Sequence, residues 1–126
     1  MKKILIAEDD RPILDALTML FEQDGYQVIG HLDGELLNSG QFEMPDIFLL
    51  DKQLSGRDGL LLCRQLKDNP ISSSIPVVII SAAAFVEPQA NLAGADAFIE
   101  KPFSSEQIRK LVETLIGQSD ARRGAA

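Results

Sequence analysis

The hydrophobic positions of the chain fall into two alternating patterns. Five short apolar runs are typical of strands, and they lie at Ile4–Ala7, Val28–Ile29, Ile47–Leu50, Val77–Ile80 and Ala97–Ile99. Three of these runs are continuous, as expected of strands that are buried on both faces of a parallel sheet. In the segments between these runs, the apolar residues have the spacing of helices. The sequence therefore predicts an α/β domain in which parallel strands are joined by crossover helices.

Local signals place the first helix. Its apolar positions follow the spacing i, i+4, i+7, i+8 and are Ile13, Leu17, Leu20 and Phe21. Asp10 can cap this helix, Pro12 suits its first turn, and Gly25 suits its C-terminal end. The residues at both ends of this segment thus agree with its apolar pattern.

The middle of the chain predicts three further helices. Residues 57–68 carry Leu62 and Leu66 on one stripe. The segments 32–42 and 85–93 have weaker patterns, and each must be a short helix if strands and helices alternate throughout. We therefore expect five strands and five helices in strict alternation.

The last helix is marked by apolar residues at Ile108, Leu111, Val112 and Leu115. Ser104 and Gln107 have the spacing of a capping box before it, and Gly117 is expected to end it. Residues 118–126 show no apolar periodicity. We therefore expect a domain over 1–117, followed by a flexible tail or a truncated linker.

Length, charge and composition exclude several classes of function for this chain. A chain of 126 residues fits one domain, and 12 basic against 19 acidic residues give a net charge of −7. That charge argues against direct binding of nucleic acid or of anionic membranes. Cys63 and His31 are the only residues of their kinds, which excludes a disulfide framework and multi-histidine metal sites. With no bilayer-length apolar run and no signal peptide, we expect a cytoplasmic protein.

Polar residues follow four of the five predicted strands. In chain order they are Glu8, Asp9, Asp10, Asp51, Ser81 and Lys101. Ligands of open α/β sheets bind at the carboxyl ends of the strands, where these residues meet. Clustered carboxylates repel each other unless a cation intervenes, and Mg²⁺ prefers such oxygen ligands. Lys101 and Ser81 then supply a second positive charge and a hydrogen bond for a phosphoryl group.

Each of these residues also has a plainer explanation. Asp10 and its neighbours can simply cap a helix and compensate its dipole. Asp51 can be a loop acid, Ser81 a strand-end hydroxyl bonded to backbone, and Lys101 a solvated surface lysine. Their coincidence at successive strand ends is what favours a common site.

Taken together, these motifs resemble the receiver domain of two-component response regulators over about residues 2–117. The matching segments, in order, are ILIAEDD at 4–10, DIFLLD at 46–51, GRDG at 56–59, IPVVIISA at 75–82 and GADAFIEKPF at 94–103. The resemblance implies a flavodoxin-like, three-layer (βα)5 fold with a five-stranded parallel sheet of order 2-1-3-4-5. It also implies a phosphorylation-activated signalling switch rather than an enzyme that acts on other substrates.

Carried over residue by residue, the resemblance implies a phosphoacceptor role for Asp51. Mg²⁺ would be held by Glu8, Asp9 and Asp51, together with the backbone carbonyl of Gln53. Lys101 would pair with the phosphoryl group, and its bond to the following proline would be cis. The phosphoryl donor would be a sensor histidine kinase or a histidine phosphotransfer protein.

The implied switch involves Ser81 and Phe98. The hydroxyl of Ser81 would move to the phosphoryl group, and Phe98 would rotate into the vacated space. That rotation alters the face formed by helix 4, strand 5 and helix 5. A downstream protein, or an output domain outside this chain, would read that face, and a phosphorylation-dependent dimer is compatible with it.

Several features depart from the family pattern, among them Ser81 where threonine is frequent and a shortened segment between Ser81 and Phe98. Ser55 stands where the family often has proline, which leaves the loop after Asp51 freer to move. Phe98 replaces a common tyrosine, so its rotation gains no hydroxyl contact and rests on packing.

Three other kinds of protein share parts of this pattern. A haloacid-dehalogenase-like phosphatase needs a second aspartate where this chain has Gln53. A flavodoxin-like nucleotide or flavin binder needs a small, hydroxyl-rich phosphate loop where three acids stand here. A receiver that only binds partners stays open, since intact site residues do not by themselves establish phosphorylation.

Overall fold

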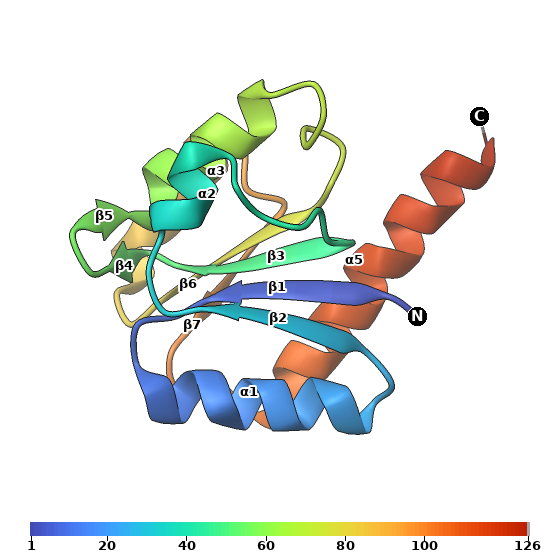
Figure 1. The fold of residues 1–126 in the computed structure, drawn as a ribbon, viewed down its shortest axis with the longest axis horizontal. Coiled ribbons are helices and arrows are strands. Elements are labelled where there is room, and N and C mark those ends of the chain that lie inside the picture. The colour runs from blue at the N-terminus through green and yellow to red at the C-terminus, as the bar shows by residue number, and fades with distance from the viewer. Residues whose placement is uncertain (126) are drawn as a thin grey trace.

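Five parallel strands form the central sheet of the computed structural model, which describes residues 1–125 (Figure 1). Their bounds are β1 Lys3–Ala7, β2 Gln27–His31, β3 Ile47–Asp51, β6 Val77–Ser81 and β7 Ala97–Glu100. The strand order is β2-β1-β3-β6-β7. The predicted order 2-1-3-4-5 is confirmed, because the two strands numbered β4 and β5 lie in a separate hairpin.

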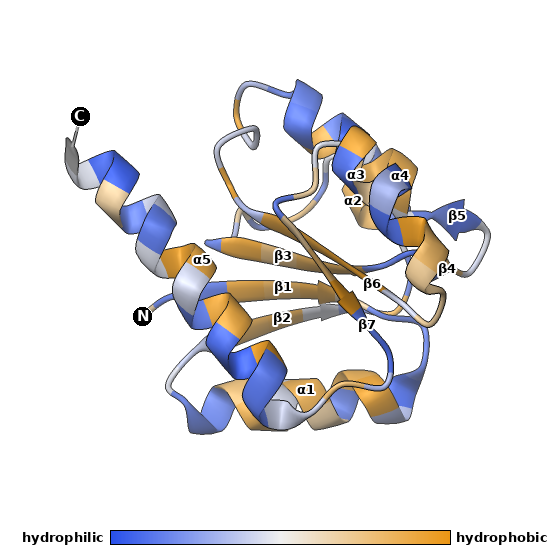
Figure 2. Cartoon of the chain, turned by 180° about the vertical axis from the view of Figure 1, so that it is seen from behind, coloured by the Kyte–Doolittle hydropathy of each residue, from blue (hydrophilic) through white to orange (hydrophobic). Residues whose placement is uncertain are grey.

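Helices cover both faces of this sheet and make the three layers (Figures 1 and 2). Their bounds are α1 Arg11–Gln23, α2 Glu35–Ser39, α3 Gly59–Asp68, α4 Glu87–Leu92 and α5 Ser105–Ala125. A short 3₁₀ turn, η1 at Ala84–Val86, precedes α4. The two weak segments are therefore helical, as the alternation predicts. Within residues 1–125, no helix is long and apolar enough to cross a membrane.

The central strands alternate between two cores. In β1, Ile4 and Ile6 pack with α1 and α5, whereas Leu5 and Ala7 pack with α2, α3 and α4. β3 divides its side chains between the same two clusters, and all five of its residues are buried. This burial on both faces explains why the sequence of these strands is continuously apolar.

The first helix begins and ends as its sequence predicts. The carboxylate of Asp10 accepts a hydrogen bond from the N–H of Ile13 at 3.2 Å. Pro12 occupies the first turn, and Gly25 follows the helix with φ +93°, a conformation that favours glycine. The cap fixes where the chain leaves β1, and thereby the direction of the acidic residues between β1 and α1.

The helix predicted over 57–68 begins two residues later than expected. Arg57–Asp58 forms β5, which pairs antiparallel with β4 at Gln53–Leu54. The carboxylate of Asp58 then accepts from the N–H of Leu60 at 2.9 Å and caps α3. This local carboxylate cap, together with the hairpin pairing, sets the start of the helix.

The last helix, α5, ends later than the sequence predicts. It passes through Gly117 and continues to Ala125, so the expected end at Gly117 is wrong. Residues 118–125 are helical rather than a flexible tail, and Ala126 lies outside the described residues. Ser119 is buried, and Asp120 accepts from the ammonium of Lys2 at 2.8 Å. These contacts offset the cost of a glycine inside the helix. The division into a domain and a linker stays a prediction.

Candidate functional site

The predicted site residues gather at the carboxyl edge of the sheet. They line a cleft of about 400 Å³ at the C-terminal ends of β1, β3 and β6. The lining includes Glu8, Asp9, Asp10, Asp51, Gln53, Ser81 and Lys101. Residues up to 93 positions apart in the chain are therefore brought to one place, because parallel strands end at the same edge.

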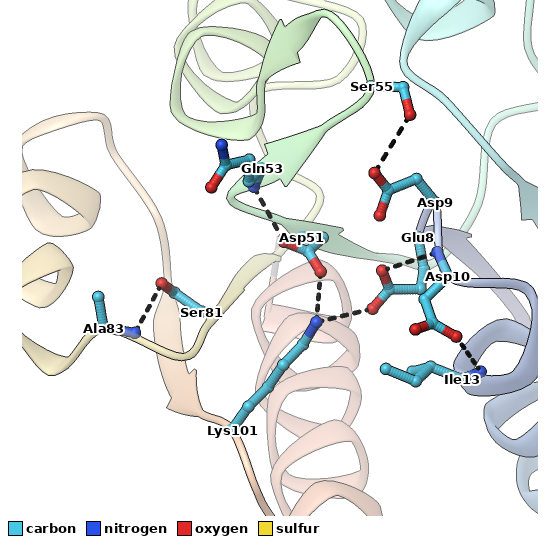
Figure 3. Close-up of polar contacts among 10 residues, drawn as sticks. All are labelled: Glu8, Asp9, Asp10, Ile13, Asp51, Gln53, Ser55, Ser81, Ala83 and Lys101. Atoms are coloured by element: carbon cyan, nitrogen blue, oxygen red, sulfur yellow. Dashed lines mark hydrogen bonds and ion pairs between the residues drawn. The ribbon is translucent and has the colours of Figure 1, made fainter.

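A lysine bridges two buried carboxylates at the floor of this cleft. The ammonium of Lys101 donates to Asp51 Oδ2 at 2.5 Å and to Glu8 Oε1 at 3.0 Å (Figure 3). Glu8 is 2% exposed and Asp51 6%. Buried charges need such partners, because burial without them is costly. The predicted approach of Lys101 to Asp51 is thus present, and its contact with Glu8 is an additional one.

The surroundings of Glu8 and Lys101 raise the pKa of both groups. Burial and the neighbouring Asp51 raise the pKa of Glu8 to about 7, against the opposing effect of Lys101. Burial lowers the pKa of Lys101, but hydrogen bonds to Asp51 and Glu8 outweigh it and leave that pKa above its ordinary value. The ammonium of Lys101 therefore stays charged at neutral pH.

Three carboxylates meet in the arrangement that a hard cation requires. One oxygen from each of Glu8, Asp9 and Asp51 lies within 4.8 Å of the others. Asp9 is exposed, whereas the other two are buried, so the cluster opens toward solvent on one side. Carboxylate oxygens with room for water on one side are the ligands that Mg²⁺ prefers. The donor set therefore fits Mg²⁺.

Backbone and side-chain hydrogen bonds hold several of these groups. Gln53 donates its N–H to Asp51 Oδ1 at 2.9 Å, and Asp10 donates its N–H to Glu8 Oε2 at 3.3 Å. The Ser81 hydroxyl accepts from the N–H of Ala83 at 3.1 Å. Asp10 itself caps α1, which is the plainer of its two sequence-based explanations.

Ser55 makes a contact that the sequence does not predict. Its hydroxyl donates to Asp9 Oδ2 at 3.2 Å, across 46 positions in the chain (Figure 3). The segment after Asp51 is a paired hairpin, β4–β5, rather than a free loop. No local pattern marks Ser55 as a partner of Asp9, because the contact depends on how the hairpin folds back over the sheet.

Phe98 lies outside the acidic cleft. It is half-buried on β7, where it pairs in register with Ile79 of β6. It lines a neighbouring hollow of about 530 Å³ together with Ala84 and Glu87 from the η1–α4 segment. The peptide bond between Lys101 and Pro102 is cis, as the resemblance implies. The predicted switch role of Phe98 stays a prediction.

Gly59 is packed against the backbone of the residue that carries the buried carboxylate. A Cβ added at Gly59 would lie 2.1 Å from the carbonyl oxygen of Asp51, where nothing flexible can yield. We expect Gly59→Ala to destabilise the fold by about 2 kcal/mol, because overpacking against backbone forces it to shift. Urea unfolding followed by circular dichroism measures this change.

A second glycine provides the matched control for that substitution. Gly117 lies inside α5, and a Cβ there meets nothing within 4 Å. Gly117→Ala should therefore stabilise the protein by up to about 1 kcal/mol. Equal stabilities of Gly59→Ala and the parent chain would contradict the close contact at Asp51.

Comparisons with known proteins agree with this fold. The sequence matches the family model of the response regulator receiver domain over residues 4–113. It is 32% identical over 120 residues to the alkaline phosphatase synthesis transcriptional regulatory protein PhoP of Bacillus subtilis (strain 168). That match covers 94% of this chain and 50% of the relative, so the chain spans about half the length of that protein.

Two solved structures show the same fold. A CheY-like response regulator receiver domain protein from Methanospirillum hungatei JF-1 superposes with a TM-score of 0.88 at 24% identity, over 97% of this chain and 98% of that one. The receiver domain of sensor histidine kinase PA1611 from Pseudomonas aeruginosa PAO1 gives 0.83 at 23% identity, over 92% and 98%. It was solved with a magnesium ion coordinated in the active site cleft.

The family match covers most of the chain, and the fold is that of the receiver domains compared with it. The chain therefore belongs to the response regulator receiver domain family of two-component systems, whose members are phosphoacceptor signalling domains rather than enzymes acting on other substrates.

Proposed function

We propose that this chain is a phosphorylation-activated switch with Asp51 as its phosphoacceptor. The observation that carries the proposal is the contact of Lys101 with the buried carboxylate of Asp51, beside two further carboxylates. A carboxylate at the end of a central strand is held rigidly, and its cleft is open to a donor. Rigid placement of the nucleophile is the main contribution of a protein to phosphoryl transfer.

The proposed reaction forms one bond and breaks one. An oxygen of the Asp51 carboxylate bonds to phosphorus, and the bond from phosphorus to the donor nitrogen breaks. The electron pair of that bond stays with the imidazole of the donor. Both oxygens of Asp51 accept hydrogen bonds, Oδ1 from the N–H of Gln53 and Oδ2 from the ammonium of Lys101, so the carboxylate is held in a fixed orientation for the attack. The donor is a sensor histidine kinase or a histidine phosphotransfer protein.

Lys101 and Ser81 then act on the transferred group. The ammonium of Lys101 is already at Asp51 and is placed to neutralise charge on a phosphoryl group attached there. The Ser81 hydroxyl accepts from Ala83 in this structure and is free to donate its proton to a phosphoryl oxygen. That movement, followed by rotation of Phe98, would change the face formed by α4, β7 and α5, which a downstream protein or output domain reads.

Glu8, Asp9 and Asp51, with the carbonyl of Gln53, are the residues that would hold Mg²⁺. When bound, the ion supplies charge that offsets repulsion between the carboxylates and an incoming phosphate. The magnesium ion in the cleft of the PA1611 receiver domain supports this assignment. So does the oxygen cluster of this chain, whose spacing fits a single cation.

The test is phosphorylation by a small donor. Incubation with acetyl phosphate and Mg²⁺ should add one phosphoryl group to the chain, measured by intact-protein mass spectrometry. Addition of EDTA should stop the reaction, because the carboxylates then repel the donor. Absence of any labelling with Mg²⁺ would contradict the proposed switch and favour a receiver that only binds partners. Undiminished labelling in EDTA would contradict the metal assignment.

A further inference from the structure

The β4–β5 hairpin places a hydroxyl against the outer side of the carboxylate cluster. Ser55 lies between the two strands and donates its hydroxyl to Asp9 Oδ2 at 3.2 Å. The other carboxylate oxygen of Asp9 turns toward Glu8 and Asp51 (Figure 3). Ser55 therefore contacts Asp9 from the side that faces away from the cluster.

The hairpin that carries Ser55 is anchored at three points. The side chain of Leu54 is 3% exposed and belongs to the core beneath the hairpin. Arg57 donates to the carboxylate of Glu35 on α2 at 2.9 Å. The N–H of Gly59 donates to the carbonyl of Lys52 at 2.6 Å and closes the base of the hairpin. Ser55 is therefore presented from a fixed support.

The turn itself does not require serine. Gly56 takes the left-handed conformation at φ +72°, which supplies the unusual backbone angle of the turn. The position before such a glycine accepts most residues, and proline is common there. The turn thus does not need the hydroxyl of Ser55, which instead donates a hydrogen bond to Asp9.

We propose that Ser55 is a positioning residue that holds the Asp9 carboxylate in the orientation for Mg²⁺ binding. The proposal rests on the proposed function, since it assigns Asp9 as a metal ligand. Asp9 is the exposed member of the cluster, and an exposed carboxylate rotates freely unless another group holds it. Hydrogen bonds to the outer oxygen of a ligating carboxylate orient it toward the metal, and their loss weakens binding.

The same hairpin also restrains the phosphoacceptor. Gln53 of β4 donates its N–H to Asp51 Oδ1, and Ser55 beyond the strand donates to Asp9 Oδ2. One rigid segment thereby fixes two of the three carboxylates relative to each other. The binding of a single cation depends on the distance between these carboxylates. The Mg²⁺ affinity should therefore change when the hydrogen bond from the hairpin to Asp9 is removed.

The experiment is calorimetric titration of the metal-stripped chain with MgCl₂. For Ser55→Ala we expect about tenfold weaker binding than for the parent chain, and Ser55→Thr, which keeps the hydroxyl, should stay within about twofold. Ser73→Ala is the matched control, because Ser73 is an exposed serine remote from the cleft. Unfolding midpoints of the variants should agree, since one exposed hydrogen bond contributes little to stability.

The outcomes separate this inference from the function on which it rests. If the parent chain binds Mg²⁺ and Ser55→Ala binds it equally or more tightly, the positioning role is refuted while the metal site stands. Equal weakening in Ser55→Ala and Ser55→Thr would also refute it, because the hydroxyl would then be irrelevant. A parent chain that binds no Mg²⁺ overturns both the inference and the metal assignment.

Discussion

Asp51→Asn is expected to abolish phosphoryl incorporation from acetyl phosphate and Mg²⁺. The carboxamide has the shape of the carboxylate and can still accept the N–H of Gln53, so the fold should be kept. It lacks the anionic oxygen that attacks phosphorus, and its nitrogen is not a nucleophile at neutral pH. Intact-protein mass spectrometry should therefore detect the parent chain with one added phosphoryl group and the variant with none.

The matched control for this substitution is Asp68→Asn. Asp68 is an exposed residue at the end of α3, far along the helix from the cleft, and the change in charge is the same. The control should be labelled like the parent. Persistent labelling of Asp51→Asn would show that another side chain accepts the phosphoryl group and would remove Asp51 from its proposed role.

Lys101→Ala is expected to separate metal binding from phosphoryl transfer. The carboxylates of Glu8, Asp9 and Asp51 remain in the variant, so Mg²⁺ affinity should be largely kept. Phosphoryl transfer should be at least about tenfold slower, because a preorganised positive charge at the reacting group is lost. The time course of labelling by mass spectrometry measures the rate, and calorimetric titration measures the affinity.

Lys110→Ala controls for the loss of a surface lysine. Lys110 is exposed on α5, and its removal changes the net charge by the same amount. Destabilisation of Lys101→Ala would be visible as a lower unfolding midpoint, because two buried carboxylates would face each other without the ammonium. In that case Lys101→Gln, which removes the charge but keeps a hydrogen-bond donor for Asp51 and Glu8, provides the variant for the rate measurement. A normal labelling rate in a folded variant that lacks the positive charge would contradict the proposed role of Lys101 in phosphoryl transfer.

The family match argues against two of the three alternative functions that the sequence analysis names. A phosphatase of the haloacid-dehalogenase type and a flavin or nucleotide binder share parts of this architecture, but the chain belongs to the receiver family. The remaining alternative, a receiver that binds partners without being phosphorylated, is decided by the labelling experiment. The residues that we propose for phosphorylation all line one cleft, which is why we favour the phosphorylated switch.

Much of the fold could be predicted because it depends on local pattern. The continuous apolar runs of β1, β3 and β6 follow from burial on both faces of the sheet. The cap of α1 at Asp10 and the reciprocal bonds of Ser104 and Gln107 before α5 follow from residues three positions apart. These signals are readable because the interacting groups are near neighbours in the chain.

Other features were decided only by contacts between distant segments. The length of α5 depends on Lys2 and on the buried side of Ser119, so a glycine that would end an isolated helix does not end this one. The start of α3 is shifted by two residues because Arg57 and Asp58 join the β4–β5 hairpin, which the buried Leu54 and the contact of Arg57 with Glu35 of α2 hold in place. Local propensity yields to such contacts wherever the energy of packing exceeds it.

The sequence by itself determined which chemical groups this protein has at the strand ends, because the apolar pattern fixes where each strand stops. Acids follow β1, an acid ends β3, a hydroxyl ends β6, and a lysine follows β7. Only the tertiary structure decided how they meet: Lys101 bridges Asp51 and Glu8, and Ser55 donates a hydrogen bond to Asp9. The physical reason is that a hydrogen bond depends on positions to within a fraction of an ångström, and those positions are set by the packing of the whole sheet and its helices.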